Sequence, residues 1–423
     1  NTAMGAGTLD ANTTAANNTA VGFVALGANT TGTQNVAVGA NALDANTTGN
    51  DNVAVGYVAL SVVTTGDNNV AMGTAALQNN TTADSNTAVG HLSLQHNTTG
   101  TENVSVGAGA LAANTTGSYN HAFGKNAGVA ITTGDTNIAI GNAALSTATT
   151  ADANVAVGHS ALAANTSGAN NTALGTNSLT TNTTASYITG VGFQALKANT
   201  TGAANAAFGA DALLANTTGG ANTAIGNNAL TANTTGANNV ALGKDALTAA
   251  TTASNNVAIG FAAAGALTTG TQNVGIGFQA LDAVTTSNSN TAIGYQSMTT
   301  MTSGNQNVAV GSGSLHSSTS ATNSVAVGFN ALTTNTTGVD NIAVGSTALD
   351  ANTTGDFNTA VGNAALSANT TADGNSAFGR EALNRNTTGA NNTAFGAVSL
   401  NVNTTGASNV AVGKGALDAN TTA

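Results

Sequence analysis

The chain has no cysteine, proline or tryptophan, and few of its residues carry a charge or an aromatic ring. Without cysteine, there is no disulfide pattern from which a redox compartment could be inferred. Only 5% of its 423 residues are Asp, Glu, Lys or Arg, and the net charge of −11 is spread thinly. This balance argues against a nucleic-acid partner. No apolar run approaches the roughly 18 residues that a membrane-spanning helix needs.

What the chain does contain is one unit of 17 residues, repeated from end to end. The segment Asn35–Asp51 shows the unit with Asn35 as position 1. Position 5 is Gly and position 13 is Thr in all 25 copies, and position 9 is Leu except at Gly128, Ala264 and Met298. Self-similarity at a short fixed period is typical of a solenoid or fibre. Residues 1–423 are therefore predicted to form a single continuous solenoid, with a shortened last repeat and no caps.

The pattern within each unit predicts its local structure. Positions 2–4 alternate Val, Ile or Thr with a small residue, as in Val36–Val38, which predicts a short strand with positions 2 and 4 toward the interior. Positions 8–11 predict a second strand with the Leu of position 9 inside, and Asn-Thr-Thr-Gly predicts a turn. The predicted fold is all-β, a narrow parallel β-solenoid of about 25 coils with two strands per coil. A three-sided helix, which usually has longer coils, is the less favoured alternative.

Stacked coils bring each position next to its own copies. Asn at position 1 and Thr at position 13 should form hydrogen-bonded ladders, and positions 6, 7, 10 and 16 should face solvent or a partner. The face with positions 1, 3 and 5 carries only small residues at position 3, which predicts close lateral packing against another chain. The repeats of Gly128 and Ala264 should be weak, because each lacks the core Leu. Val129 or Ile131 is the candidate replacement in the first repeat, and Leu267 in the second.

Three segments, Asn52–Leu60, Asn154–Leu162 and Asn341–Leu349, carry the motif Asn-Val-Ala-Val-Gly-x-x-Ala-Leu or a close variant. This motif resembles the head repeats of trimeric autotransporter adhesins. Asn290–Met298 is similar to the Asn-Thr-Ala-Val-Gly-Tyr-Gln-Ala-Leu arrays of bacterial surface proteins and phage tail fibres. The resemblance implies a left-handed β-roll packed as a trimer, outside the cell, on a cell surface or on a virion. The unit here is longer than the adhesin unit, because the Asn-Thr-Thr-Gly turn is additional.

Residues for catalysis or metal binding do not converge in this pattern. An active site needs different residues at one place, whereas here the same residues recur. The five His occupy scattered repeat positions, and only His91 and His96 share a unit. Surface drift is the favoured interpretation over a metal site. The sequence therefore predicts no enzyme activity, no metal and no cofactor.

Two sets of residues are candidate sites. Asn-Thr-Thr at Asn12, Asn29 and Asn46 matches the N-glycosylation sequon, although a turn copied by repeat duplication is the favoured interpretation. Position 6 carries Phe261, Phe278 and Tyr295 in three consecutive repeats, which predicts a stacked aromatic ladder. The favoured interpretation of this ladder is simple stacking between coils. The alternatives are a contact between chains and a sugar-binding strip.

These observations together predict a non-enzymatic structural or adhesive extracellular fibre, which self-associates as a homotrimer or filament. Glycans or a host surface are further candidate partners. The end repeats keep the register of the others, which predicts head-to-tail stacking or a longer fibre. The alternatives are an ice-binding solenoid, suggested by the Thr columns, and a carbohydrate-binding fibre. Against ice binding, adjacent Thr residues in extended backbone point to opposite faces.

Overall fold

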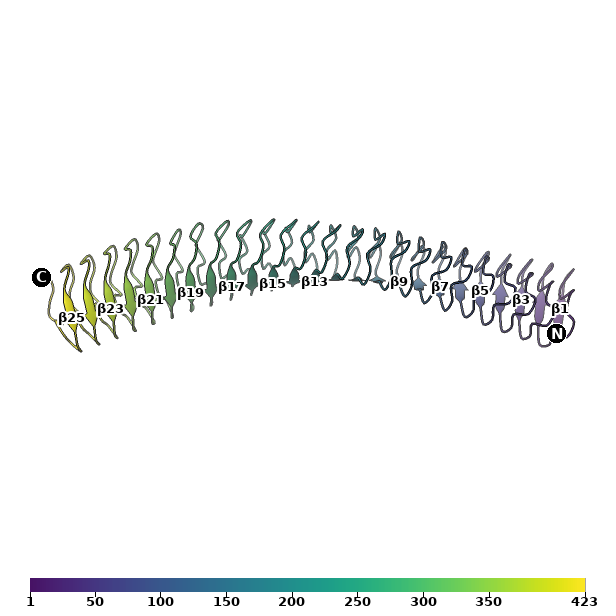
Figure 1. Ribbon diagram of the computed structural model, residues 1–423, viewed down its shortest axis with the longest axis horizontal. Helices are drawn as coiled ribbons and strands as arrows, with labels where there is room; N and C mark the ends of the chain where they lie inside the picture. Colours follow the sequence, from purple (N-terminus) through teal and green to yellow (C-terminus); the bar gives the residue numbers. More distant parts are fainter. Residues whose placement is uncertain (423) are drawn as a thin grey trace. The chain divides into compact units, whose positions relative to one another are not determined.

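The computed structural model describes residues 1–422 and divides into two compact units, Asn1–Asp211 (unit 1) and Ala212–Ala423 (unit 2). In each unit every repeat forms one coil, with a three-residue strand at positions 2–4 (Figure 1). The described residues contain no helix, and within each unit neighbouring strands pair in parallel. The fold is a parallel β-solenoid with a 17-residue repeat, which confirms the predicted fold class.

The strands have the following bounds. Those of unit 1 are β1 (Thr2–Met4), β2 (Thr19–Val21), β3 (Val36–Val38), β4 (Val53–Val55), β5 (Val70–Met72), β6 (Thr87–Val89), β7 (Val104–Val106), β8 (His121–Phe123), β9 (Ile138–Ile140), β10 (Val155–Val157), β11 (Thr172–Leu174), β12 (Thr189–Val191) and β13 (Ala206–Phe208). Those of unit 2 are β14 (Thr223–Ile225), β15 (Val240–Leu242), β16 (Val257–Ile259), β17 (Val274–Ile276), β18 (Thr291–Ile293), β19 (Val308–Val310), β20 (Val325–Val327), β21 (Ile342–Val344), β22 (Thr359–Val361), β23 (Ser376–Phe378), β24 (Thr393–Phe395) and β25 (Val410–Val412).

The register between coils follows the repeat without slippage. Val36 pairs with Val53 in unit 1, and Val257 pairs with Val274 in unit 2, each 17 residues further along. Every repeat position therefore forms a column of copies along its unit. Such columns allow one side-chain interaction to be repeated in coil after coil.

The prediction for the two faces of the strand is wrong, because positions 2 and 4 point outward. Val38 is 37% exposed and Leu174 is 46% exposed, whereas Ala37 at position 3 is fully buried. The Leu of position 9 lies inside as predicted, and Leu43 and Leu60 have no exposed surface. The interior of each coil is thus lined by Leu and by small residues.

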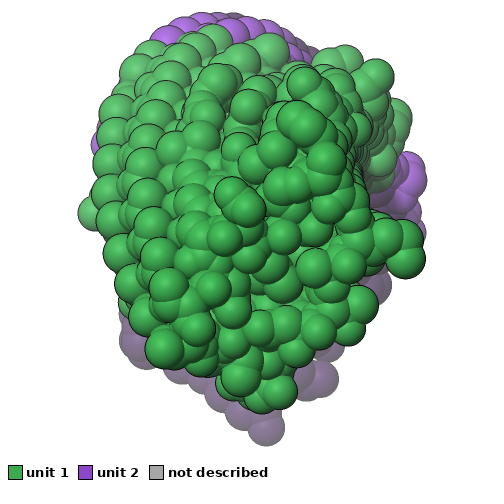
Figure 2. All heavy atoms as spheres, turned by 90° about the vertical axis from the view of Figure 1, so that its right-hand side faces the viewer, with its two compact units in different colours: residues 1–211 green, residues 212–423 purple. Residues whose placement is uncertain are grey.

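The inversion has a steric cause, since the two walls of the coil approach each other closely at position 3. Position 3 packs against position 8 of the preceding repeat, and where both are Ser, Ser93 Oγ donates to Ser105 Oγ at 2.7 Å. Where position 3 is Gly190, the hydroxyl of Ser178 occupies the space that a Cβ would take. Figure 2 views the chain from its N-terminal end, with the atoms of unit 1 in green. Only small side chains fit at this contact, so the branched ones lie outside.

The face proposed for lateral packing is therefore also wrong, because positions 1, 3 and 5 belong to the interior or the corner of their own coil. The Gly of position 5 makes the corner after the strand. Gly90 has a φ of +132°, and a Cβ there would lie 2.7 Å from the carbonyl oxygen of Gly107 in the next coil. A positive φ and a close backbone contact together explain why no other residue occurs at this position.

The second wall of the coil differs from the expected second strand. Asn41 at position 7 and Leu43 at position 9 adopt φ values of 55° and 54°, in the left-handed region. Hydrogen bonds between coils hold this conformation: Leu43 N donates to Ala59 O at 3.0 Å, and Asn41 N donates to Phe23 O at 2.9 Å. Backbone groups on this wall are thereby satisfied without strand geometry.

Asparagine and threonine ladders cross-link the coils, as predicted for positions 1 and 13. At position 1, Asn18 Oδ1 accepts from Asn35 N at 2.9 Å. At position 13, Thr30 Oγ1 donates to Thr47 O at 3.0 Å. A third ladder lies at position 12, where Asn46 Nδ2 donates to Asn29 Oδ1 at 3.0 Å. The buried Asn side chains thus bond to the Asn of neighbouring coils, which satisfies most of the polar groups in an Asn-rich core.

The position-12 ladder breaks where the next repeat has an apolar residue. The Oδ1 atoms of Asn46, Asn114 and Asn233 are buried without a hydrogen-bond partner, and Val63, Ile131 and Ala250 follow them in the column. At Ile131 the break has a packing reason, because its repeat has Gly128 in place of the core Leu. Ile131 is only 1% exposed, and a Cβ on Gly128 would lie 3.0 Å from its Cδ1.

In the repeats of Gly128 and Ala264, the side chain that replaces the missing core Leu therefore comes from position 12. Leu267 is fully buried in the repeat of Ala264, as Ile131 is in that of Gly128, whereas Val129 is half-buried. The structure thus selects Ile131 rather than Val129. The expected weakness of these two coils stays a prediction.

Candidate functional site

The outward side chains at positions 2 and 4 form a surface along each unit, named here the strand face, that is apolar throughout at position 4 and mixed at position 2. Val, Ile and Thr prevail at position 2, and position 4 carries Val, Ile, Leu, Met or Phe in every copy. Phe395 is 57% exposed, and neither position carries Asp, Glu, Lys or Arg in any repeat. Contiguous exposed apolar patches are uncommon on monomeric proteins and are typical of interaction surfaces.

The aromatic ladder predicted at position 6 is present in unit 2. The ring centroids of Phe261 and Phe278 are 5.4 Å apart, and those of Phe278 and Tyr295 are 5.3 Å apart, with nearly parallel planes. Lys244 Nζ lies 5.4 Å from the centroid of Phe261 and extends the column by a cation–π contact. A role for the ladder in binding stays a prediction.

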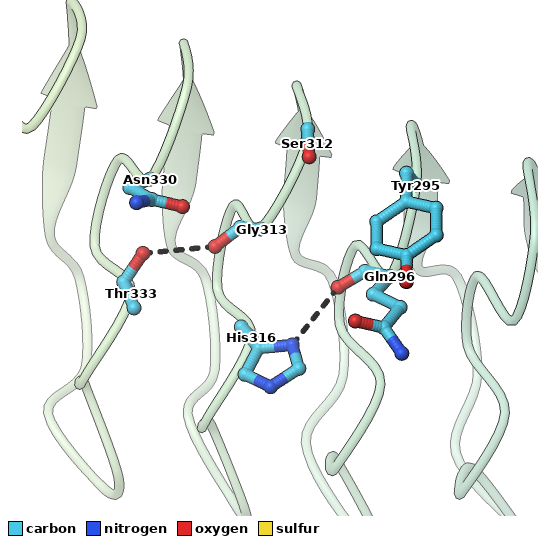
Figure 3. Close-up of a pocket in the computed structure, with 7 residues that line it drawn as sticks. All are labelled: Tyr295, Gln296, Ser312, Gly313, His316, Asn330 and Thr333. Atoms are coloured by element: carbon cyan, nitrogen blue, oxygen red, sulfur yellow. Dashed lines mark hydrogen bonds between the residues drawn. The ribbon is translucent and has the colours of Figure 1, made fainter.

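A pocket of about 200 Å³ opens at the Tyr295 end of this ladder (Figure 3). It is lined by Tyr295, Gln296, Ser312, Gly313, His316, Asn330 and Thr333. These residues come from three successive coils, those of β18, β19 and β20.

Two hydrogen bonds fix the pocket wall. Thr333 Oγ1 donates to Gly313 O at 2.9 Å, and His316 Nδ1 lies 3.2 Å from Gln296 O (Figure 3). Apart from Tyr295, these residues were not predicted from the sequence. The available signal was Ser312, which interrupts the aromatic residues at position 6 between Tyr295 and Phe329.

The predicted glycosylation residues occupy the interior or the edge of the coil. Asn29 and Asn46 are fully buried, and Asn29 Nδ2 donates to Gly32 O at 3.0 Å. Asn12 is half-buried. An N-linked glycan is attached at this same nitrogen, so the folded coil has no room for one at Asn29 or Asn46. The geometry instead gives this Asn a structural role in the position-12 ladder.

The two Thr of the turn have different environments. Position 13 donates its hydroxyl to the next coil, whereas position 14 is exposed, as at Thr31 and Thr48. Position 14 is Thr or Ser in every copy. The two neighbouring Thr therefore do not present a pair of free hydroxyls.

The remaining titratable residues form no recognisable centre. His91, His96, His121 and His159 are exposed, and His316 is half-buried at the pocket. Within residues 1–422, no three His, Cys, Asp or Glu side chains are placed to hold a metal ion.

Burial raises the pKa of the carboxyls of Asp44, Asp282 and Asp350. All three are at position 10, on separate coils. Their raised pKa values therefore report burial on the second wall, not a shared site.

In the part of the chain that the structure describes, no helix is long and apolar enough to cross a membrane. Comparison with known proteins adds no relative, since no family model matches the chain and no curated protein matches it significantly.

Proposed function

We propose that the protein is a non-enzymatic structural or adhesive fibre component whose chains associate side by side through the strand face. The observation that supports this proposal is the exposed surface at positions 2 and 4, which carries no Asp, Glu, Lys or Arg and is apolar throughout at position 4. Its occupant is a second copy of the same chain. Two copies share the 17-residue period, so their strand faces stay in step along the whole contact, which a partner of different period could not do.

The size of the strand face is sufficient for a stable contact. Burying the exposed third of a Val or Ile side chain contributes roughly 0.5–1 kcal/mol, because full burial contributes about 1.5–3 kcal/mol. The strands of unit 1 carry thirteen apolar side chains at position 4 and six Val or Ile at position 2, which together give about 10–19 kcal/mol. Association costs roughly 4–15 kcal/mol in lost freedom of motion. The gain per coil is small, but its repetition makes the sum favourable.

The resemblance to adhesin head repeats and phage fibres supports the rest of the proposal. It suggests three copies per assembly and a location on a cell surface or a virion. Ice binding has less support, because the hydroxyls of position 13 already donate to the backbone of the next coil. A thermal-hysteresis assay distinguishes this alternative, and the fibre proposal expects no hysteresis.

Sedimentation velocity at micromolar concentration tests the self-association. The wild-type chain is expected to sediment as an oligomer, and the double variant Val155→Lys, Val157→Lys as a single chain, because each Lys would have to lose its hydration in the contact. The control variant carries Ala153→Lys and Ala163→Lys in or beside the same coil, away from the strand face, and should assemble normally. A single-chain wild type, or equal effects of the two variants, would contradict the proposal.

A further inference from the structure

The aromatic column at position 6 of unit 2 has a gap of one coil. Phe261, Phe278 and Tyr295 stack in succession, then Ser312 takes the place of a ring, and Phe329 follows in the next coil. Successive coils are about 4.8 Å apart. The gap therefore leaves one ring position open above Ser312, and the pocket lies at this place.

The floor of the gap is kept bare by two small residues. Ser312 is the residue of position 6, and Gly313, with a φ of +67°, is that of position 7. A Cβ on Gly313 would collide with Asn330 Oδ1, so a larger residue would displace the pocket wall. The rings of Tyr295 and Phe278 lie in nearly parallel planes, and the Tyr295 ring lines the pocket beside the gap (Figure 3).

The lining determines the class of ligand. Besides the Tyr295 ring, the pocket is lined by the amides of Gln296 and Asn330, the hydroxyls of Ser312 and Thr333, and the His316 ring. None of the seven lining residues is Asp, Glu, Lys or Arg, so a strongly charged ligand finds no counter-ion. Purely apolar ligands favour enclosed and mostly apolar sites, and this pocket is open, with polar groups on both walls.

We infer that this gap binds one pyranose ring of a neutral saccharide, packed against the Tyr295 ring that lines it. The C–H groups on one side of a pyranose carry partial positive charge and fit the negative face of the aromatic ring. Its hydroxyls are both donors and acceptors, which matches the surrounding amides and hydroxyls. The site lies beyond the Gly corner from the strand face and does not depend on the side-by-side association.

Saturation-transfer NMR with the full chain tests the inference. The probes are the methyl pyranosides of glucose, galactose, mannose and N-acetylglucosamine. At least one should receive saturation, with a Kd on the order of millimolar, as expected for a ligand of a dozen heavy atoms. Absence of binding by all four at up to about 50 mM would overturn the inference.

Two variants locate the binding. Ser312→Phe fills the gap with the ring that neighbouring repeats carry at this position, so the coil should fold and the affinity should fall by about tenfold or more. Ser346→Phe makes the same change at position 6 outside the pocket and should leave the affinity unchanged.

Tyr295→Ala removes the stacking face and should also weaken binding about tenfold, with circular dichroism confirming the fold of each variant. Equal affinities of the wild type and the Ser312→Phe variant would refute the site. If phenol bound to the protein and none of the four pyranosides displaced it, the ligand class would be refuted.

Discussion

Most repeats carry Leu at position 9 and Asn at position 12. Either Gly128→Leu or Ile131→Asn alone is expected to destabilise the coil, whereas the two substitutions together should be tolerated. Each residue compensates for the other, because Ile131 fills the interior space that a Leu at position 9 would occupy. The backbone accepts the Leu, since Leu111 and Leu145 adopt φ values of 47° and 51° at the same position, close to the 58° of Gly128.

The structure sets the magnitudes. Gly128→Leu places a side chain against Ile131 Cδ1 and Leu111 Cδ2, each 3.0 Å from the new Cβ, and overpacking of this kind costs about 1–3 kcal/mol. Ile131→Asn loses an aliphatic side chain worth about 2–5 kcal/mol. It also supplies a donor to the unpaired Oδ1 of Asn114, but its own Oδ1 then faces Ala148 without a donor, so the number of unpaired acceptors in the ladder stays the same. The double variant should be near neutral, so the coupling energy is at least about 2 kcal/mol.

Hydrogen exchange followed by mass spectrometry is the suitable assay, because repeat arrays open locally and not in one transition. Peptides covering residues 120–137 should exchange faster in both single variants and at the wild-type rate in the double variant. In the matched double variant Ala264→Leu, Leu267→Asn the recovery of slow exchange should be smaller. Its new Asn would lie between Ala250 and Val284 in the position-12 column and would find no ladder partner there. Additive effects at Gly128 and Ile131 would refute the reasoning.

Three further predictions follow from the interior. Ala156→Leu should destabilise its coil by about 1–3 kcal/mol in denaturant titrations, since Ala156 is fully buried, whereas Ala163→Leu on the outer wall should be within about 0.5 kcal/mol of wild type; equal effects would place position 3 outside the core. Burial raises the pKa of the Asp44 carboxyl, so its ionised form is disfavoured in the folded coil at neutral pH, and this penalty disappears as the pH falls through the raised value. Asp44→Asn should therefore raise stability at pH 7 and lose this gain near pH 3, which thermal melts at the two pH values can check, and a gain that grows in acid would contradict it. Gly90→Ala should slow or prevent folding of its coil, measured by circular dichroism, because its Cβ would lie 2.7 Å from Gly107 O; a wild-type melting curve would contradict the steric account.

The repeat pattern was sufficient to predict the fold class, the 17-residue register and the buried Leu. Each depends on one residue type at one position, such as Leu43 or Leu60, and not on knowledge of the coil's cross-section. The Asn and Thr ladders could be predicted for the same reason, because stacking places identical residues next to each other. The stacked rings of Phe261, Phe278 and Tyr295 followed from their spacing alone.

The orientation of the strand could not be decided from alternation, because both of its faces carry apolar residues. The small residue at position 3 was interpreted as a contact between chains, although it reflects the narrow interior shown by Ser93 and Ser105. The second wall was also beyond sequence reasoning. Leu43 adopts a positive φ that this residue rarely takes, and hydrogen bonds to the neighbouring coil impose it. The pocket depends on an interruption at Ser312, which only the assembled column makes visible.

Cysteine cross-linking tests most directly whether strand faces of two chains meet. The chain has no cysteine, so Val157→Cys introduces a single thiol on the strand face and Ala163→Cys a single thiol on the other wall. Packed sheets lie about 10 Å apart, and a bismaleimide of that span should join two copies of the Val157→Cys variant at micromolar concentration. The account predicts efficient cross-linking at Val157 and little at Ala163. Efficient cross-linking at Ala163 with none at Val157 would contradict it.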